Sequence, residues 1–123
     1  MDIRATLVDL CEAFNAHDLD RIMSFFADDC VLEMPRGSEP WGRRFEGKSN
    51  VRAALATRFE GLPDVHSGNG EHFVDSNAET GISKWILTGT ARDGTKKKVH
   101  GCDFYTFRNG KVIRKDSYWK IVE

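Results

Sequence analysis

The chain has 123 residues, the size of one domain with a single hydrophobic core. Its 18 basic and 19 acidic residues nearly cancel, which gives no electrostatic basis for binding nucleic acid. No apolar run approaches the length of a membrane span, so we expect a cytoplasmic protein that does not bind a membrane. The 3 cysteines and 4 histidines lack metal-ligand spacing, and we expect no metal and no cofactor.

The N-terminal third predicts two helices and a strand. Apolar residues at helical spacing indicate a first helix over residues 3–14, with Asp2 as its N-cap. Asp18 caps a short second helix that carries apolar residues as far as Phe26. A short strand is then expected from Cys30 to Met34.

A long loop and a third helix follow. Residues 35–47 contain Pro, Gly and Trp41 without a regular pattern, and loops of this length often cover or bind a ligand. The third helix is predicted over residues 49–60, where Gly61 and Pro63 end it.

The remainder of the chain predicts a strand series over residues 65–74, 78–92, 96–107 and 111–122. Asp93-Gly94 and Asn109-Gly110 are favoured hairpin turns. Helices followed by a meander predict an α+β fold. We expect a cone-shaped, curved antiparallel sheet that forms an α+β barrel, with three helices packed on its concave face and a ligand cavity at its mouth.

Asp103 is the most unusual residue of the strand series, because aspartate is depleted in strands. Alternation places it on the same face as Val99, Tyr105 and Phe107, among apolar groups. A carboxylate there is either a hydrogen-bonded structural acid or part of a pocket.

Alternation also makes assignments elsewhere in the strand series. In the last strand Ile113, Lys115, Ser117 and Trp119 share one face. On the first long strand, alternation places His66 and His72 on the same face, so one of them could reach the cavity. The run at residues 96–98 is interpreted as a solvated strand start.

Five segments resemble the nuclear transport factor 2-like superfamily, within its branch of SnoaL-like polyketide cyclases and ketosteroid isomerases. They are Phe14–Asp20, Phe26–Val31, Gly37–Pro40, Gly101–Phe107 and Gly110–Ile113. The resemblance covers nearly the whole chain and implies a single SnoaL-like domain over residues 1–123. Because this fold carries isomerases, cyclases, hydratases and binding proteins, the resemblance determines the fold better than the function.

The resemblance also implies roles for three positions. The isomerase branch has an aspartate base where this chain has Met34, and a tyrosine donor where it has Leu10. Only the acid of the penultimate strand is retained, as Asp103. Allylic isomerisation of a steroid needs both a base and oxyanion donors, so this mechanism is not expected. In the polyketide cyclase branch an aspartate on this strand is the acid/base residue, and Asp103 matches that role.

The site expected from these patterns has Asp103 as the catalytic residue. The expected ligand-binding residues are Leu10, Phe14, Met34, Trp41, Phe59, Tyr105, Lys115, Ser117 and Trp119. If Lys115 pairs with Asp103 it lowers the pKa of the acid, whereas an apolar surround raises it by up to about 3–5 units. The two alternatives would make Asp103 either a base or a neutral donor.

The leading hypothesis is an enzyme that acts on a hydrophobic carbonyl or hydroxyl compound by isomerisation, cyclisation or hydration. The alternative is a non-catalytic protein that binds a hydrophobic small molecule, or a dimerisation module of the same fold. The resemblance further implies a homodimer through the outer face of the sheet, to which His100, Phe104 and Tyr118 would contribute.

Overall fold

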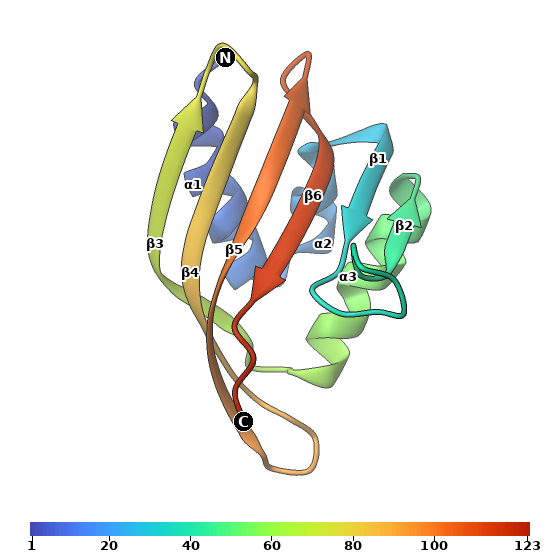
Figure 1. Cartoon of the computed structure of the whole chain (residues 1–123), viewed down its shortest axis with the longest axis vertical. Helices are drawn as coiled ribbons and strands as arrows, with labels where there is room; N and C mark the ends of the chain where they lie inside the picture. The colour runs from blue at the N-terminus through green and yellow to red at the C-terminus, as the bar shows by residue number, and fades with distance from the viewer.

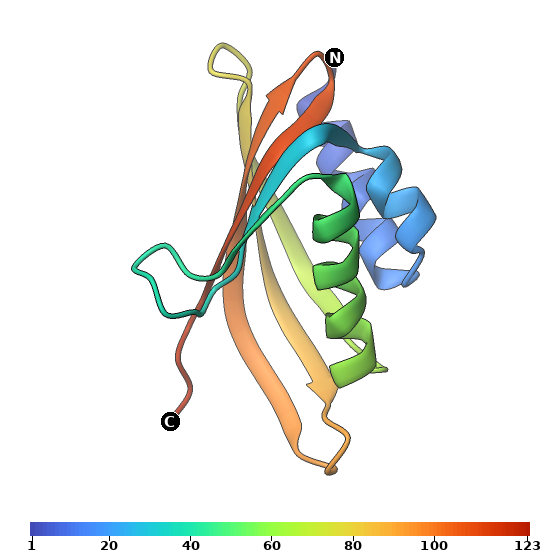
Figure 2. The same cartoon turned by 90° about the vertical axis from the view of Figure 1, so that its right-hand side faces the viewer.

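The computed structural model describes all 123 residues. Its elements are α1 (Ile3–Asn15), α2 (Leu19–Ser24), β1 (Phe26–Glu33), β2 (Arg44–Glu46), α3 (Lys48–Gly61), β3 (His66–Asp75), β4 (Thr80–Thr90), β5 (Lys96–Arg108) and β6 (Lys111–Trp119). The expected α+β class is confirmed: the three helices lie on the concave face of one curved sheet (Figures 1 and 2). None of these helices has the length and apolar composition that crossing a membrane requires.

The helices form where capping and apolar spacing predict them. Asp2 Oδ1 accepts a hydrogen bond from the Ala5 amide at 3.0 Å, and Asp18 Oδ1 accepts one from the Arg21 amide at 3.1 Å. Each bond satisfies a backbone donor that the first helical turn leaves free. The buried face of α1 then packs against the sheet through Leu7 and its helical neighbours.

The sheet has the strand order β2-β1-β6-β5-β4-β3 and is mixed, which corrects the expectation of a purely antiparallel sheet. β1 runs parallel to β6, with Leu32 opposite Lys115, because the chain leaves β1 through α3 and the meander before it returns. The sheet also stays open, with β2 and β3 as its two edges, rather than closing into a barrel.

The expected boundaries differ most at β1, at the loop after it and at β6, which ends at Trp119 instead of Val122. β1 begins at Phe26 instead of Cys30, because Phe26 is buried in the core and pairs with Val112. The acidic pair Asp28 and Asp29 lies in an irregular part of this strand and faces solvent, so it does not interrupt the strand. The long loop after β1 contains the short edge strand β2, which pairs with β1.

Two bulges reverse the alternation that simple parity predicts. Between Gly68 and Glu71 the register of β3 shifts, so His66 is exposed while His72 is half-buried opposite Ser83. A second shift, in the pairing of β5 with β6, brings Val112 rather than Ile113 to the buried face. A bulge adds one residue to one strand only, which a single-strand pattern cannot reveal.

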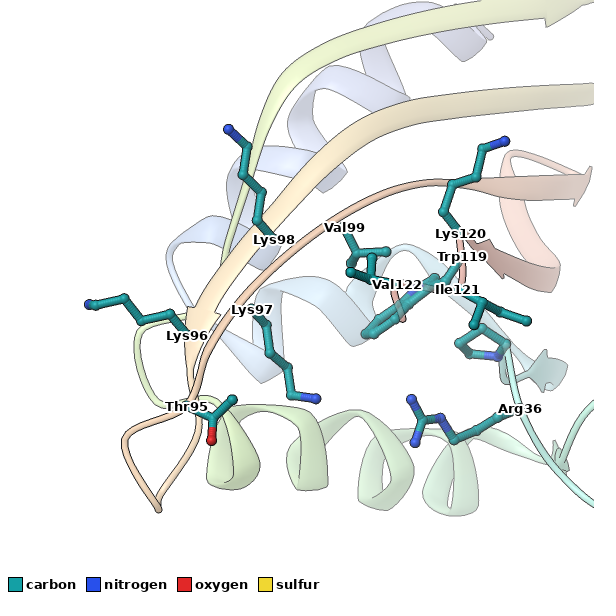
Figure 3. Close-up of a pocket in the computed structure, with 11 residues that line it drawn as sticks. Arg36, Thr95, Lys96, Lys97, Lys98, Val99, Trp119, Lys120, Ile121 and Val122 are labelled. Carbon is teal, nitrogen blue, oxygen red and sulfur yellow. The ribbon is translucent and has the colours of Figure 1, made fainter.

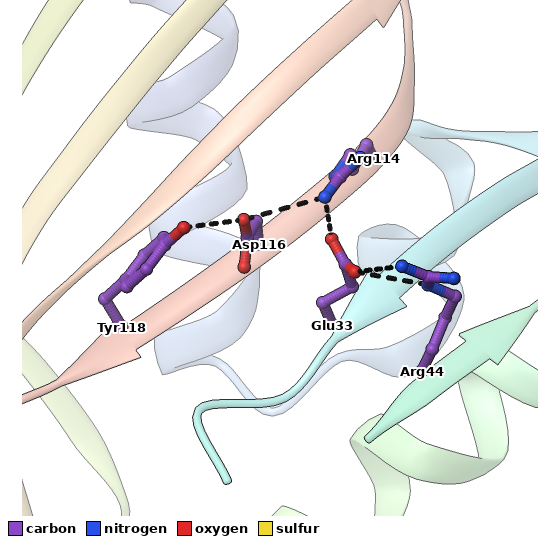
Figure 4. Close-up of polar contacts among 5 residues, drawn as sticks. All are labelled: Glu33, Arg44, Arg114, Asp116 and Tyr118. Carbon is purple, nitrogen blue, oxygen red and sulfur yellow. Dashed lines mark hydrogen bonds and ion pairs between the residues drawn. The ribbon is translucent and has the colours of Figure 1, made fainter. Parts of the chain in front are cut away.

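The outer face of β1, β2 and β6 is held by a carboxylate between two arginines (Figure 4). Glu33 is fully buried, and its Oε2 accepts from Arg44 Nη2 at 2.8 Å and Nε at 3.1 Å. Its Oε1 forms an ion pair with Arg114. Arg114 also approaches Asp116 Oδ2, which accepts from the Tyr118 hydroxyl at 3.0 Å. This network joins β1 and β2 to β6.

Candidate functional site

A row of polar side chains crosses the inner face of the sheet. Ser83 lies opposite Asp103 in the pairing of β4 with β5, and Asp103 lies opposite Ser117 in the pairing of β5 with β6. Their exposed fractions are 1, 7 and 2 % respectively. Because side chains alternate between the two faces of a strand, these three polar residues lie on the same inner face as the apolar residues two positions away.

Asp103 accepts three hydrogen bonds from the protein. Its Oδ1 accepts from the Lys115 ammonium at 2.9 Å and from the Ser117 hydroxyl at 2.6 Å. Its Oδ2 accepts from the indole nitrogen of Trp85 at 2.9 Å. Lys115 Nζ also donates to Ser117 Oγ at 2.9 Å, so the three groups form a closed triangle. The pairing of Lys115 with Asp103, which the sequence left open as one of two alternatives, is thus present.

Trp85 reaches Asp103 because residue 101 is glycine. A Cβ atom on Gly101 would lie 2.5 Å from Trp85 Cη2 and 2.5 Å from the carbonyl oxygen of Tyr118. The indole ring therefore occupies the space of the missing side chain, directly opposite on the neighbouring strand. Trp85 was not singled out from the sequence, and the signal that could have identified it is this glycine in the middle of β5.

The electrostatics of the cluster favour an ionised carboxylate. Burial raises the pKa of Asp103, but the Lys115 charge, the Ser117 and Lys115 hydrogen bonds and Arg58 together hold it below its ordinary value. For Lys115 burial has the larger effect and lowers its pKa, although Asp103 opposes this. Of the two protonation states left open by the sequence, the lowered pKa favours the ionised carboxylate over the neutral acid.

Other predicted residues surround the Lys115 ammonium. Its nitrogen lies 5.4 Å from the ring centre of Phe14 and 6.0 Å from that of Tyr105, distances at which an aromatic face attracts a cation. Burial raises the pKa of Tyr105 well above its ordinary value, so its hydroxyl stays protonated. Leu10 and Tyr105 both belong to the main core cluster, and Phe14 packs against it.

The thiol of Cys11 on α1 belongs to the same region. Burial, followed by the charge of Asp103, raises its pKa to about 11, so it stays a neutral thiol. It is also close enough to the Ser83 hydroxyl for a hydrogen bond to oppose that rise. The sequence identified Cys11 only as a small core residue, since its sequence neighbours do not indicate what it packs against.

A second aromatic group lies nearer the C-terminal end of α3. Trp119 stands edge-on to Trp85 with ring centres 6.1 Å apart, and its indole nitrogen is buried without a hydrogen-bond partner. The Arg58 guanidinium lies over the Trp119 ring at 5.1 Å. Phe59 stacks on His17 with ring centres 4.5 Å apart. Arg58 was not recognised from the sequence, because a charged residue interrupts the apolar stripe on that helix.

Two adjoining pockets open beside Trp119. One, of about 390 Å³, brings together four of the predicted residues: Met34, Trp41, Ser117 and Trp119. Trp41 is exposed there, and the Arg44 guanidinium lies over its ring at 5.0 Å.

The other pocket, of about 540 Å³, is lined by Trp119, Val99, the start of β5, the loop at Arg36 and the C-terminal residues. In Figure 3 Lys97 and Arg36 extend toward one another across this opening, with α3 behind them. The run at 96–98 is exposed, as expected, but it also borders this pocket.

No group of three or more histidine, cysteine, aspartate or glutamate side chains is arranged to hold a metal ion. The carboxylate of Asp103 is not part of such a group either, because the Lys115 ammonium lies beside it.

The open curved sheet with helices on one face is the cystatin-like, nuclear transport factor 2-like architecture. The model of the SnoaL-like domain matches residues 7–115, so the chain belongs to the SnoaL-like family. Comparison with curated proteins gives no sequence match.

Solved structures similar to this chain include candidate polyketide cyclases from Xanthomonas campestris and Pseudomonas putida. The first has a TM-score of 0.85 and 17% identity, over 95% of this chain and 89% of that one. The second has a TM-score of 0.83 and 14% identity, over 94% and 89%. A candidate isomerase from Bacillus subtilis has a TM-score of 0.80 and 17% identity, over 94% and 84%. At these identities the likeness establishes the fold.

Proposed function

We propose that this protein is a small-molecule enzyme of the cyclase or isomerase kind, in which Asp103 moves a proton on a hydrophobic carbonyl compound. The observation that carries the proposal is the buried ion pair of Asp103 and Lys115 on the inner face of the sheet. Buried charge pairs are costly to desolvate, and strongly perturbed acids concentrate at functional sites. The cyclase and isomerase names of its structural neighbours agree with this class.

The state of Asp103 defines the chemistry it can perform. A carboxylate with a lowered pKa is a weak base, so it can take a proton only from a carbon acidified by adjacent carbonyl groups. The electron pair of the broken C–H bond moves onto a carbonyl oxygen as an enolate. The Lys115 ammonium next to Asp103 supplies the positive charge that stabilises it. Attack of the enolate carbon on a second carbonyl, with return of the proton to the new alkoxide, gives cyclisation. Where a C=C bond of the substrate is conjugated with the enolate, return of the proton to the far carbon of that system gives isomerisation.

The second candidate is a binding protein without catalysis. It is favoured by the saturation of Asp103, whose three protein donors leave little capacity for a substrate proton. It is also favoured by Met34 and Leu10, which are apolar where the isomerase branch has a base and a donor.

Proton exchange separates the two candidates without knowledge of the natural substrate. We expect the protein to accelerate exchange of the acidic C–H of ethyl benzoylacetate with deuterium in D₂O, followed by NMR. Asp103→Asn should reduce the protein-dependent rate about 100-fold or more, the usual contribution of a positioned base. The matched control is Asp28→Asn, which removes an exposed carboxylate from β1. Exchange that is unchanged by Asp103→Asn would favour the binding protein.

A further inference from the structure

Arg58 lies on the buried side of α3, where a charged residue is unusual. It follows Val51 and Leu55 at helical spacing, and both of these are buried in the core. Its guanidinium is half-buried and lies over the ring of Trp119, on the inner face of the sheet. The charge of Asp103 raises the pKa of Arg58, so the two groups interact electrostatically.

This guanidinium has no anionic partner in the protein. Arg52, on an earlier turn of the same helix, pairs with Asp20 at 2.7 Å, and Arg44 pairs with Glu33 at 2.8 Å. Arg58 forms no ion pair and donates no hydrogen bond. Among side-chain nitrogens and oxygens, only Glu33 Oε1 and Trp119 Nε1 are both buried and without a hydrogen-bond partner. The nitrogens of Arg58, which also lack a partner, therefore keep accessible surface.

The missing partner has an energetic consequence. Burial lowers the pKa of Arg58, and the more distant charge of Asp103 only partly opposes this. Its unused donors are open to an acceptor, and an anion would be held most strongly because the hydrogen bonds would be charge-assisted. An arginine fork over an aromatic ring is well suited to a planar anionic group such as a carboxylate.

The opening beside Trp119 is positively charged, as Arg58 is. The 540 Å³ pocket is bordered by Arg36, Lys120 and three lysines at the start of β5, and by no acidic residue. None of these five basic side chains is in an ion pair, although the chain as a whole has a net charge of −1. Val99 and Trp119 give the pocket an apolar floor. Such a combination attracts a molecule with an anionic group and an apolar body.

We propose that the ligand of this protein is an apolar organic anion, and that Arg58 is the residue that receives its anionic group. The inference deepens the proposed function by assigning a substrate class to the same site. The apolar body of the ligand lies against Trp119, and the basic opening at Lys97 and Arg36 raises the local concentration of anions. Arg58 is thus a specificity-determining residue, separate from the base at Asp103.

A matched pair of fluorescent probes tests the assignment by binding alone. 1-Anilinonaphthalene-8-sulfonate carries a sulfonate, and N-phenyl-1-naphthylamine has the same rings without it. We expect the sulfonate to bind about tenfold or more tightly than the neutral probe, since a charge-assisted bond replaces an unpaired cation. Arg58→Gln should remove this advantage, and Arg58→Lys should restore part of it. Arg52→Gln, on the exposed side of the same helix, should leave both affinities unchanged.

Equal affinity for the two probes would overturn the proposal, and so would failure of the sulfonate to bind. A loss of both affinities in Arg58→Gln would equally overturn it, because the residue would then act only on the packing of the site. Circular dichroism and thermal unfolding confirm that each variant is folded. These binding results do not depend on turnover. If the protein prefers the sulfonate but Asp103→Asn leaves proton exchange unchanged, only the proposed function is refuted. Exchange that depends on Asp103 in a protein indifferent to the sulfonate would refute only the anion assignment.

Discussion

Lys115 Nζ lies 2.9 Å from Asp103 Oδ1, although the two residues are not opposite one another in the sheet. Asp103 faces Ser117 across β5 and β6, and Lys115 faces Tyr105. The long lysine side chain therefore runs diagonally across the inner face to reach the carboxylate. Diagonal neighbours in an antiparallel pair are within reach of long side chains. The ion pair consequently depends on the length of the lysine as much as on the strand register.

The two charges should depend strongly on one another for stability. Asp103→Asn leaves the Lys115 ammonium buried beside a neutral group, and we expect a loss of about 3–5 kcal/mol in the free energy of unfolding. In the double variant Asp103→Asn/Lys115→Met both charges are removed, and most of the loss should be recovered. Urea unfolding of the wild type, both single variants and the double variant measures the coupling. Additive losses would show that the pair is not a unit.

Acid should weaken the wild type through the same carboxylate. The folded pKa of Asp103 lies below its ordinary value of about 3.9, so the unfolded chain binds more protons than the native one in that interval. The stabilisation is complete above the ordinary pKa and is lost as the pH falls through the folded value. Unfolding free energies measured between about pH 6 and pH 2.5 should therefore fall more steeply for the wild type than for the double variant. Parallel curves would contradict an ionised Asp103.

Gly101 should tolerate no side chain. In Gly101→Ala the new Cβ would meet the Trp85 ring and the carbonyl oxygen of Tyr118, each at 2.5 Å, and the backbone oxygen cannot move cheaply. We expect a loss of about 1–3 kcal/mol and a changed tryptophan fluorescence spectrum, because the Trp85 indole leaves Asp103. The control is Gly61→Ala at the end of α3, where the new Cβ meets nothing within 4 Å. That variant should keep or slightly raise stability.

The homodimer implied by the family resemblance stays a prediction. Phe73, Phe104 and Tyr118 are exposed on the outer face of the sheet, opposite the helices. Exposed aromatic residues gathered on one face are typical of an interface. Phe104→Glu should convert a dimer into a monomer in sedimentation equilibrium without unfolding the chain. A wild type that is monomeric at the highest accessible concentration would contradict the dimer.

The helices and the strand meander could be predicted from local signals. Asp2 and Asp18 are side-chain caps, and Asp93-Gly94 and Asn109-Gly110 are turns, all of which act within a few residues. The parallel pairing of β1 with β6 could not be predicted in this way, because the two strands are separated by most of the chain. The bulges in β3 and β6 were also missed, since they depend on the partner strand.

The sequence by itself indicated that Asp103 shares a strand face with apolar residues and that Lys115 and Ser117 share one face of the last strand, because alternation along a strand is a local property. Only the tertiary structure showed the direction of the pKa shift of the acid, since it depends on Lys115 and Ser117 of β6 and on Arg58 of α3. Only the tertiary structure, too, brought Trp85 over Gly101 and left Arg58 without a partner. These relationships arise between elements far apart in the chain, where a pattern in one segment contains no information about distance.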